Sequence, residues 1–295
     1  MGSRLSSPHV LWLILLSVAA SWGCDDVTEV VPTPPAKAVD KWARWCPTDS
    51  SKIAYTHLAV TWEEYLQYGP ESVWIVDIET GQREHVAEGW AHDWSPEGQE
   101  ILLARGGSLL LRNLTSGAEE TLLECAGGLC GRSRFSPQGG VMTYITSYGA
   151  GAGTWLLEPG QAEAAHISAK FASDWSPDGE EIICDSLVII TEAGVRVERI
   201  PYSAELGYVG SAAWSPMGST MTFGANGGIW SISRDGTQEK LLADQGFNPS
   251  WSPDGTRLAY DAISADGKGG VIWVMSTDGT GKTQVTDPIS YVDSE

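Results

Sequence analysis

The feature that most constrains the fold of this 295-residue chain is a recurring phrase, an aromatic residue followed by Ser-Pro-x-Gly. Five copies, at steps of 41, 40, 39 and 37 positions, begin at Trp94, Phe135, Trp175, Trp214 and Trp251. A sixth, degenerate copy begins at Trp45, and an insertion accounts for its wider spacing of 49 positions from Trp94. Proline fixes φ and glycine readily takes positive φ, so each phrase predicts a tight turn between two strands.

The remainder of each unit is also periodic. In the five clear copies, apolar residues lie seven and nine positions after the aromatic, as in Ile101 and Leu103, which indicates a strand with one buried face. A third strand is centred, unit by unit, on Trp74, Leu110, Trp155, Val188, Trp230 and Trp273. A turn glycine and a fourth segment follow. Four short strands repeated six times predict an all-β fold over residues 41–295, a six-bladed β-propeller with four antiparallel strands per blade.

The N-terminal segment does not share this repeat. Arg4 precedes an apolar run from Val10 to Ala20, which is too short at about 1.5 Å per residue to cross a bilayer, so residues 1–23 are interpreted as a signal peptide. Residues 24–40 contain three prolines and predict a flexible tether.

The residues around Cys24 bear on membrane attachment. Ser21-Trp22-Gly23-Cys24 resembles a bacterial lipoprotein cleavage site, which implies that Cys24 becomes a lipidated N-terminus. The alternative is cleavage after Ala20, which gives a soluble periplasmic protein with Cys24 as a spare thiol. The 18 Lys and Arg against 38 Asp and Glu give a net charge of −20, so we expect no nucleic-acid binding and no membrane attachment other than through the lipid.

The best-preserved turns also suggest a relationship. Trp175–Gly179 and Trp251–Gly255 read Trp-Ser-Pro-Asp-Gly, which resembles the repeat of TolB-type propellers, and the resemblance covers residues 41–287. It implies an exported protein of the bacterial cell envelope, facing the periplasm or the cell surface. TolB carries an additional N-terminal α/β domain through which it works in the Tol–Pal system. The sixteen residues between Cys24 and the first blade are too few for that domain, so the resemblance does not imply that role.

Irregular loops are expected on one face of the propeller, where second strands connect to third strands and fourth strands to the next blade. Aromatic residues concentrate there, and exposed aromatics on a rigid scaffold are typical of binding surfaces. The candidates for a partner-binding face are Trp62, Tyr65, Tyr68, Tyr148, Tyr202 and Tyr208. We predict a monomeric, non-catalytic propeller that binds an envelope protein or a glycan. The alternatives are that these aromatics only cover the channel mouth or pack on the blade tops, or that the protein is a purely structural part of an envelope complex.

Signals for catalysis are sparse. The sequence has no G-x-S-x-G motif, and its histidines fall on separate elements, so we predict no catalytic residues, no metal site and no cofactor. The channel candidates are His92, Asp93 and Asp174. Two carboxylates in a channel could hold Ca²⁺ or carry out acid–base chemistry, so a hydrolase or lyase, with or without Ca²⁺, is the alternative function.

The remaining cysteines suit an oxidising compartment. Cys125 and Cys130 are close enough in sequence to form a disulfide across one loop. Cys46 and Cys184 belong to opposed blades, cannot pair, and are expected to be buried thiols.

The lipid anchor yields a direct test. Cys24→Ser should move the protein from the membrane fraction to the soluble periplasmic fraction, because the acidic surface offers no second attachment signal. Fractionation followed by immunoblotting measures this. A variant that stays with the membrane, or a mature N-terminus at Ser21, would rule out the lipoprotein interpretation.

Overall fold

The computed structural model describes residues 37–287, apart from residues 64, 126–129, 147–150, 159, 162–163 and 268. For residues 60–70 it describes only the backbone. The predicted signal peptide, the tether up to residue 36, Cys24 and Tyr148 therefore lie outside the described residues. The described residues belong to one compact unit, Pro35–Glu295. Its first strand begins at Lys37, ahead of the predicted blade boundary at residue 41.

The strands of this unit form successive antiparallel groups of four, as the repeats predict. The groups are β1 (Lys37–Cys46), β2 (Asp49–Glu63), β3 (Tyr65–Asp77) and β4 (Arg83–Glu88); β5 (Trp90–Trp94), β6 (Glu100–Arg105), β7 (Ser108–Asn113) and β8 (Glu119–Glu124); β9 (Gly131–Phe135), β10 (Met142–Thr146), β11 (Gly153–Leu157) and β12 (Ala165–Ser168); β13 (Ala172–Trp175), β14 (Glu181–Cys184), β15 (Val188–Thr191) and β16 (Arg196–Arg199); β17 (Val209–Trp214), β18 (Thr220–Ala225), β19 (Gly228–Ser233) and β20 (Lys240–Ala243); β21 (Phe247–Trp251), β22 (Arg257–Ile263), β23 (Gly270–Ser276) and β24 (Thr283–Gln284).

The first and last groups differ from the expected pattern because they share one sheet. A parallel pair between Val39 of β1 and Gly270 of β23 joins β1–β4 to β21–β24, whereas the other groups are separate four-stranded sheets. A Cβ atom at position 270 would lie 2.9 Å from Cγ1 of Val39. Glycine is therefore what allows the two strands to approach closely enough to pair.

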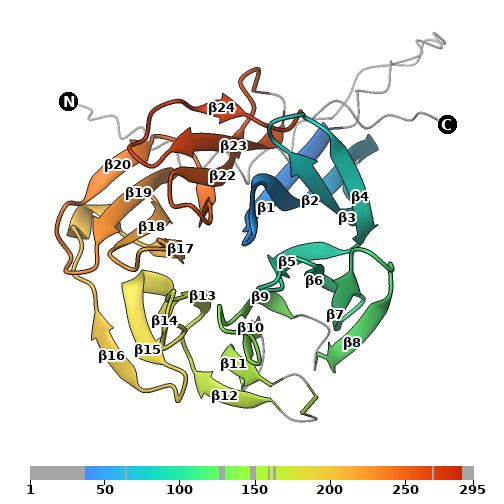
Figure 1. Cartoon of the computed structure of the whole chain (residues 1–295). Coiled ribbons are helices and arrows are strands. Elements are labelled where there is room, and N and C mark those ends of the chain that lie inside the picture. Colours follow the sequence, from blue (N-terminus) through green and yellow to red (C-terminus); the bar gives the residue numbers. More distant parts are fainter. Residues whose placement is uncertain are drawn as a thin grey trace, which may run out of the picture. The chain divides into compact units, whose positions relative to one another are not determined.

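The groups follow one another around a ring (Figure 1). The first strand of each group contacts the first strand of the next, and β21 contacts β1, so these contacts form a closed circuit. Apolar clusters fill the junctions between consecutive groups. At one junction Trp94 packs with Ala54 and Val73 of the preceding group, and at the closing junction Tyr55 packs with Ile272. The core is thus distributed around the ring, between the sheets.

The repeated Ser-Pro-x-Gly phrases form the predicted turns. In the copy that follows β5, the Gly98 N–H donates to the Ser95 carbonyl at 2.8 Å, and Gly98 has φ +69°. The Ser95 hydroxyl oxygen accepts from the Glu100 N–H at 3.1 Å, which satisfies a donor at the start of β6. The serine is therefore needed for its side chain as well as for the turn itself.

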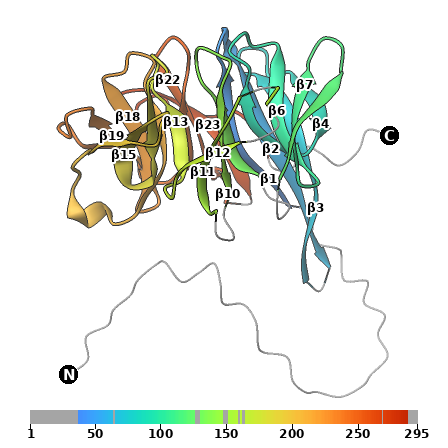
Figure 2. The ribbon, with the colours of Figure 1, turned by 90° about the horizontal axis from the view of Figure 1, so that it is seen from below.

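The insertion between Trp45 and Trp94, where an irregular loop carrying Trp62, Tyr65 and Tyr68 is expected, is instead a paired hairpin. Pairing continues from Val60 with Tyr68 to Glu63 with Tyr65, so β2 and β3 are much longer than the other strands. Figure 2 shows this hairpin projecting beyond the neighbouring sheets. Thr, Trp, Tyr and Leu are compatible with an extended conformation, so the segment could continue the ladder rather than form a loop.

The cysteines are arranged as the sequence indicates. Cys125 and Cys130 form a disulfide with their Cα atoms 5.7 Å apart. Cys46 and Cys184 are buried free thiols, and burial raises the pKa of Cys184 to about 12. The Cys184 thiol is therefore not primed to react at neutral pH.

Trp175 provides a test of the junction packing. It is buried at the junction before β13, where its Nε1 donates to the Arg134 carbonyl at 3.4 Å. Trp175→Ala should lower the free energy of unfolding by about 3 to 5 kcal/mol, because it leaves a cavity between two groups. Urea denaturation followed by circular dichroism measures this, with Met217→Ala, at an 84% exposed position, as the control. Equal effects of the two substitutions would contradict the packing assignment.

Candidate functional site

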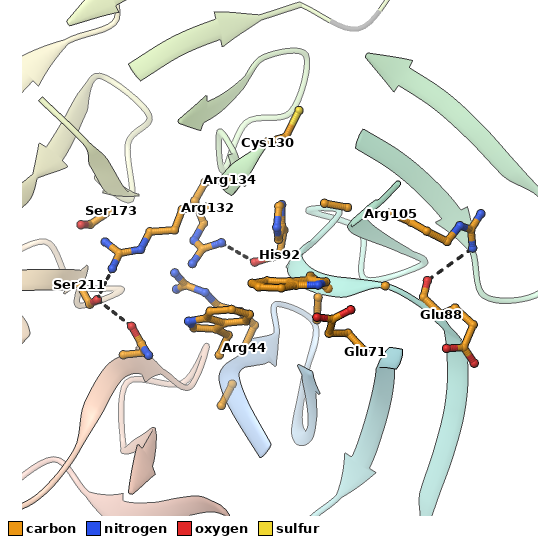
Figure 3. A pocket seen from close by; sticks show the side chains of 18 of the residues that line it. Arg44, Glu71, Glu88, His92, Arg105, Cys130, Arg132, Arg134, Ser173 and Ser211 are labelled. Atoms are coloured by element: carbon orange, nitrogen blue, oxygen red, sulfur yellow. Dashed lines mark hydrogen bonds between the residues drawn. The ribbon is translucent and has the colours of Figure 1, made fainter. Parts of the chain in front are cut away.

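The first strands converge on a central cavity of about 640 Å³ (Figure 3). Residues from β1, β5, β9, β13, β17 and β21 line it, together with the β6–β7 turn and the β4–β5 connection. Its polar and aromatic lining includes Trp42, Arg44, Trp90, His92, Arg132, Arg134, Ser173, Ser211 and Asn248. The ring therefore encloses a site to which every first strand contributes.

One register position organises the junctions around this cavity. It is the position immediately before the aromatic residue of each repeat, and in chain order it holds Arg44, Asp93, Arg134, Asp174, Ala213 and Ser250. A carboxylate oxygen of Asp93 accepts from the Phe135 N–H at 2.9 Å, and one of Asp174 accepts from the Trp214 N–H at 2.9 Å. The Ser250 hydroxyl accepts from the Trp45 N–H at 3.5 Å. Each of these bonds joins the first strand of one group to the first strand of the next.

The two carboxylates singled out from sequence are therefore bound to the backbone. Burial raises the pKa of Asp93, with the charge of Asp174 as a smaller contribution in the same direction, although Arg134 and Arg44 oppose the shift. Among the described residues, no group of three or more His, Cys, Asp or Glu side chains is arranged to hold a metal ion. The role of Asp93 and Asp174 in Ca²⁺ binding or catalysis stays a prediction.

The sequence interpretation missed the arginines at the same register position. Arg134 is buried, and its guanidinium donates to the carbonyls of His92 and Ser133. Burial, followed by the positive charge of Arg44, lowers the pKa of Arg134 to about 9. The alternation Arg44, Asp93, Arg134, Asp174 was visible in the aligned repeats, and it is the signal that could have revealed these residues.

A backbone irregularity turns further side chains toward the cavity. Three positions before the repeat aromatic, four non-glycine residues have positive φ: Trp42 (60°), Arg132 (35°), Ser211 (50°) and Asn248 (51°). Each lies at a register shift between the first and second strands of its group. Such conformations cost of order 1 to 3 kcal/mol each and concentrate at functional sites.

A directional chain of hydrogen bonds connects these irregular positions. Arg132 donates to the Ser211 hydroxyl at 2.8 Å, which donates to the Asn248 side-chain oxygen at 2.7 Å. The Asn248 amide donates in turn to Asp261 at 2.6 Å, and the other oxygen of Asp261 accepts from the Trp42 N–H at 3.1 Å. Burial raises the pKa of Asp261 to about 7. The chain thus holds part of the cavity wall in a fixed arrangement.

His92, the third channel candidate, is buried in the cavity wall on β5. Its Nδ1 lies 3.4 Å from the Ser133 N–H, which can only donate, so Nδ1 is the acceptor of a neutral ring. Burial, with smaller contributions from Arg134 and Arg44, lowers the pKa of His92 to about 3. At neutral pH this side chain carries no charge.

The predicted partner-binding aromatics do not all belong to one exposed surface. Tyr208 is 69% exposed, whereas Tyr202 is half-buried, packs against an apolar cluster, and accepts a hydrogen bond from Arg199 at 3.2 Å. Trp62, Tyr65 and Tyr68 lie in the β2–β3 hairpin, and their side chains, like Tyr148, fall outside the described residues. At the cavity rim Trp42 and Trp90 stack with ring centroids 4.7 Å apart.

Comparison by sequence finds no relative. No protein-family model matches the chain, and no curated protein is significantly similar to it. In the described part of the chain, no helix has the length and apolar character needed to cross a bilayer.

Comparison by structure shows the fold. Putative TolB from Agrobacterium tumefaciens matches with a TM-score of 0.64 and 21% identity, over 73% of this chain and 88% of that one. TolB from Acinetobacter baumannii matches with a TM-score of 0.64 and 17% identity, over 86% of this chain and 65% of that one. Acylaminoacyl peptidase from Pyrococcus horikoshii matches with a TM-score of 0.55 and 13% identity, over 86% of this chain and 53% of that one. This chain thus spans less than two thirds of the last two proteins. The shared feature is a TolB-like β-propeller fold.

The buried histidine predicts a pH dependence of stability. Because the pKa of His92 is about 3 when folded and near 6.5 when unfolded, the unfolded chain binds the extra proton in that interval. Stability should therefore be lost as pH falls from about 6.5 toward 3, by up to about 1.4 kcal/mol per pH unit from this group. The raised pKa values of Asp93 and Asp261 act in the opposite direction and oppose part of this loss.

His92→Gln separates these contributions. Between pH 4 and 6 the variant should lose less free energy of unfolding per pH unit than the unmodified protein, measured by urea denaturation at each pH. His85→Gln, at an exposed histidine, is the control and should keep the original slope. Identical slopes for the His92 variant and the unmodified protein would contradict the buried neutral assignment.

Proposed function

We propose that this chain is an exported, lipid-anchored, six-bladed β-propeller that binds another protein of the bacterial envelope and catalyses no reaction. The closed circuit of first strands supports counting the eight-stranded sheet as two blades. The TolB-like fold and the Trp-Ser-Pro-Asp-Gly repeats support placing it in the envelope.

The observation that carries the binding function is a set of exposed apolar side chains on the face where the cavity opens. Tyr208 precedes β17, Phe247 begins β21 and Ile263 ends β22, and they are 69%, 58% and 49% exposed. In an antiparallel group, the start of the first strand, the end of the second and the start of the third lie on one face. The β6–β7 turn in the cavity lining and the long β2–β3 hairpin belong to that face as well.

A protein partner suits this surface better than a substrate. Aromatic side chains around a recess are typical of protein interfaces, where a few of them carry most of the binding energy. The groups considered for catalysis already have structural partners: Asp93 and Asp174 bond to backbone N–H groups, and His92 is neutral. The similarity to acylaminoacyl peptidase extends over 53% of that protein and supports a shared propeller fold without favouring its reaction.

A pull-down with matched variants tests this proposal. The double variant Tyr208→Ala, Phe247→Ala should stay folded by circular dichroism, because both side chains are exposed, and should weaken capture of its envelope partner by about 30-fold or more, as for a hot spot of 2 kcal/mol. The combined variant Trp62→Ala, Tyr65→Ala, Tyr68→Ala tests the hairpin in the same assay. Capture from detergent-solubilised envelope is quantified by mass spectrometry.

Met217→Ala is the control, since Met217 is exposed in the turn between β17 and β18, on the opposite face. It should capture the partner as well as the unmodified protein does. Loss of capture in this variant, with normal capture by the aromatic variants, would place the interface on the other face.

A further inference from the structure

Three guanidinium groups converge in the central cavity of a strongly acidic protein. Arg44 projects from β1, and Arg132 and Arg134 project from β9, into the same space (Figure 3). Only 18 of the 295 residues are Lys or Arg, against 38 Asp and Glu. A gathering of cations at the centre of such a chain is not a consequence of its composition.

Among the described residues none of these arginines makes an ion pair, although the charges of Asp93 and Asp174, outside ion-pair distance, act to raise the pKa of Arg134. Arg134 donates to two backbone carbonyls and Arg132 to a serine hydroxyl. Within the described ranges, the guanidinium of Arg44 makes no hydrogen bond or ion pair, and no ion pair involves Arg132 or Arg134. The positive charge of Arg44 contributes to lowering the pKa of both other arginines, so the groups repel one another.

Donors at this site are left without acceptors. Nε of Arg134 and the hydroxyl of Ser173 are buried without a hydrogen-bond partner, on residues that are 7% and 1% exposed. Both residues line the cavity. Leaving a buried polar group unsatisfied is unfavourable, and more so for a charged group, so such positions call for a ligand.

The carboxylates nearby do not fulfil this need. Asp93, Asp174 and Asp261 each accept from backbone N–H groups and do not line the cavity. Glu71 and Glu88 contribute to the lining, yet neither makes an ion pair with the three arginines in the described structure. Among the charged side chains of the lining, four are arginines and two are glutamates, so the charge of the lining is predominantly positive.

We propose that Arg44, Arg132 and Arg134, with the hydroxyl of Ser173, form a binding site for an oxyanion, either a carboxylate or a phosphate group. Guanidinium groups bind both through paired, charge-assisted hydrogen bonds. A bound oxyanion offsets the repulsion among the arginines and supplies acceptors for the unsatisfied donors. This site adjoins the proposed protein interface, since Tyr208 and Arg132 influence each other's pKa, but its ligands are not interface residues, so either property can be present without the other.

Isothermal titration calorimetry with two small probes tests the proposal. The purified protein is titrated with inorganic phosphate and, separately, with succinate, at low salt and neutral pH. Binding of at least one probe with a Kd below about 1 mM, weakened on addition of salt, is expected for a site of clustered cations. If phosphate binds more tightly, the natural ligand carries a phosphate group. If succinate binds more tightly, it carries a carboxylate.

Arg44→Gln is the principal variant because this side chain has no partner whose loss would disturb the fold. It should weaken probe binding by at least tenfold while raising thermal stability without probe, since a repelling charge has been removed. A purely structural role predicts lower stability instead. Ser173→Ala should weaken binding by about tenfold without loss of stability, because its hydroxyl has no partner in the folded protein.

Arg112→Gln is the matched control. Arg112 lies on β7, pairs with Glu119 at 3.1 Å, and is not part of the cavity lining. This variant should bind the probe as the unmodified protein does. Absence of binding by both probes, or equal binding by the Arg44→Gln variant and the unmodified protein, would overturn the oxyanion site whatever the outcome of the partner pull-down.

Discussion

The structure depends on hydrogen bonds that cross the junctions between consecutive groups of strands, since the first strand of every group except the first lies at the edge of its sheet. Two kinds of bond alternate over five of the six junctions between first strands, and among the described residues the junction of β17 with β21, where the register position is Ala213, has neither kind. Asp93, Asp174 and Ser250 accept from the backbone of the following group, whereas the indoles of Trp94 and Trp175 donate to the carbonyls of the preceding group. Apolar clusters supply the area buried at each junction, and these directional bonds fix how the first strands meet there.

This alternation explains why one register position carries opposite charges. The carbonyls that accept from Trp94 and Trp175 are those of Arg44 and Arg134. At these junctions the following tryptophan already provides the crossing bond, so the side chain before the repeat aromatic is not required for it and extends into the cavity. At three other junctions the side chain itself, of Asp93, Asp174 or Ser250, makes the crossing bond, whereas Ala213 at the remaining junction has no side chain that can do so. The repeat thus separates positions that hold the ring together from positions that shape the site.

Much of the strand pattern could be predicted from the sequence, because each turn and strand is specified by residues close together in the chain. Gly98 and Ser95, for example, form their turn with local partners. The pair between Val39 and Gly270 joins distant residues and leaves no local signal. The same holds for the positive φ of Arg132, which the first-strand irregularity imposes on a residue that does not favour it. Asp93 and Asp174 were singled out as channel carboxylates, but they bond to the backbone and do not line the cavity, and attention to carboxylates as catalytic groups left Arg44 and Arg134 unnoticed at the same register.

Closure through the two ends of the chain has a consequence for the order of assembly. The junction between β1–β4 and β21–β24 contains Tyr55 packed on Ile272, and Arg257 donates to the Ser50 carbonyl at 2.6 Å. These contacts link residues more than 200 positions apart, so the apolar face of the first group stays uncovered until the last group has been synthesised. Contacts of such high sequence separation form slowly and leave partly folded chains prone to association. A circular arrangement of this kind is therefore limited more by the rate at which the chain folds than by the stability of the folded state.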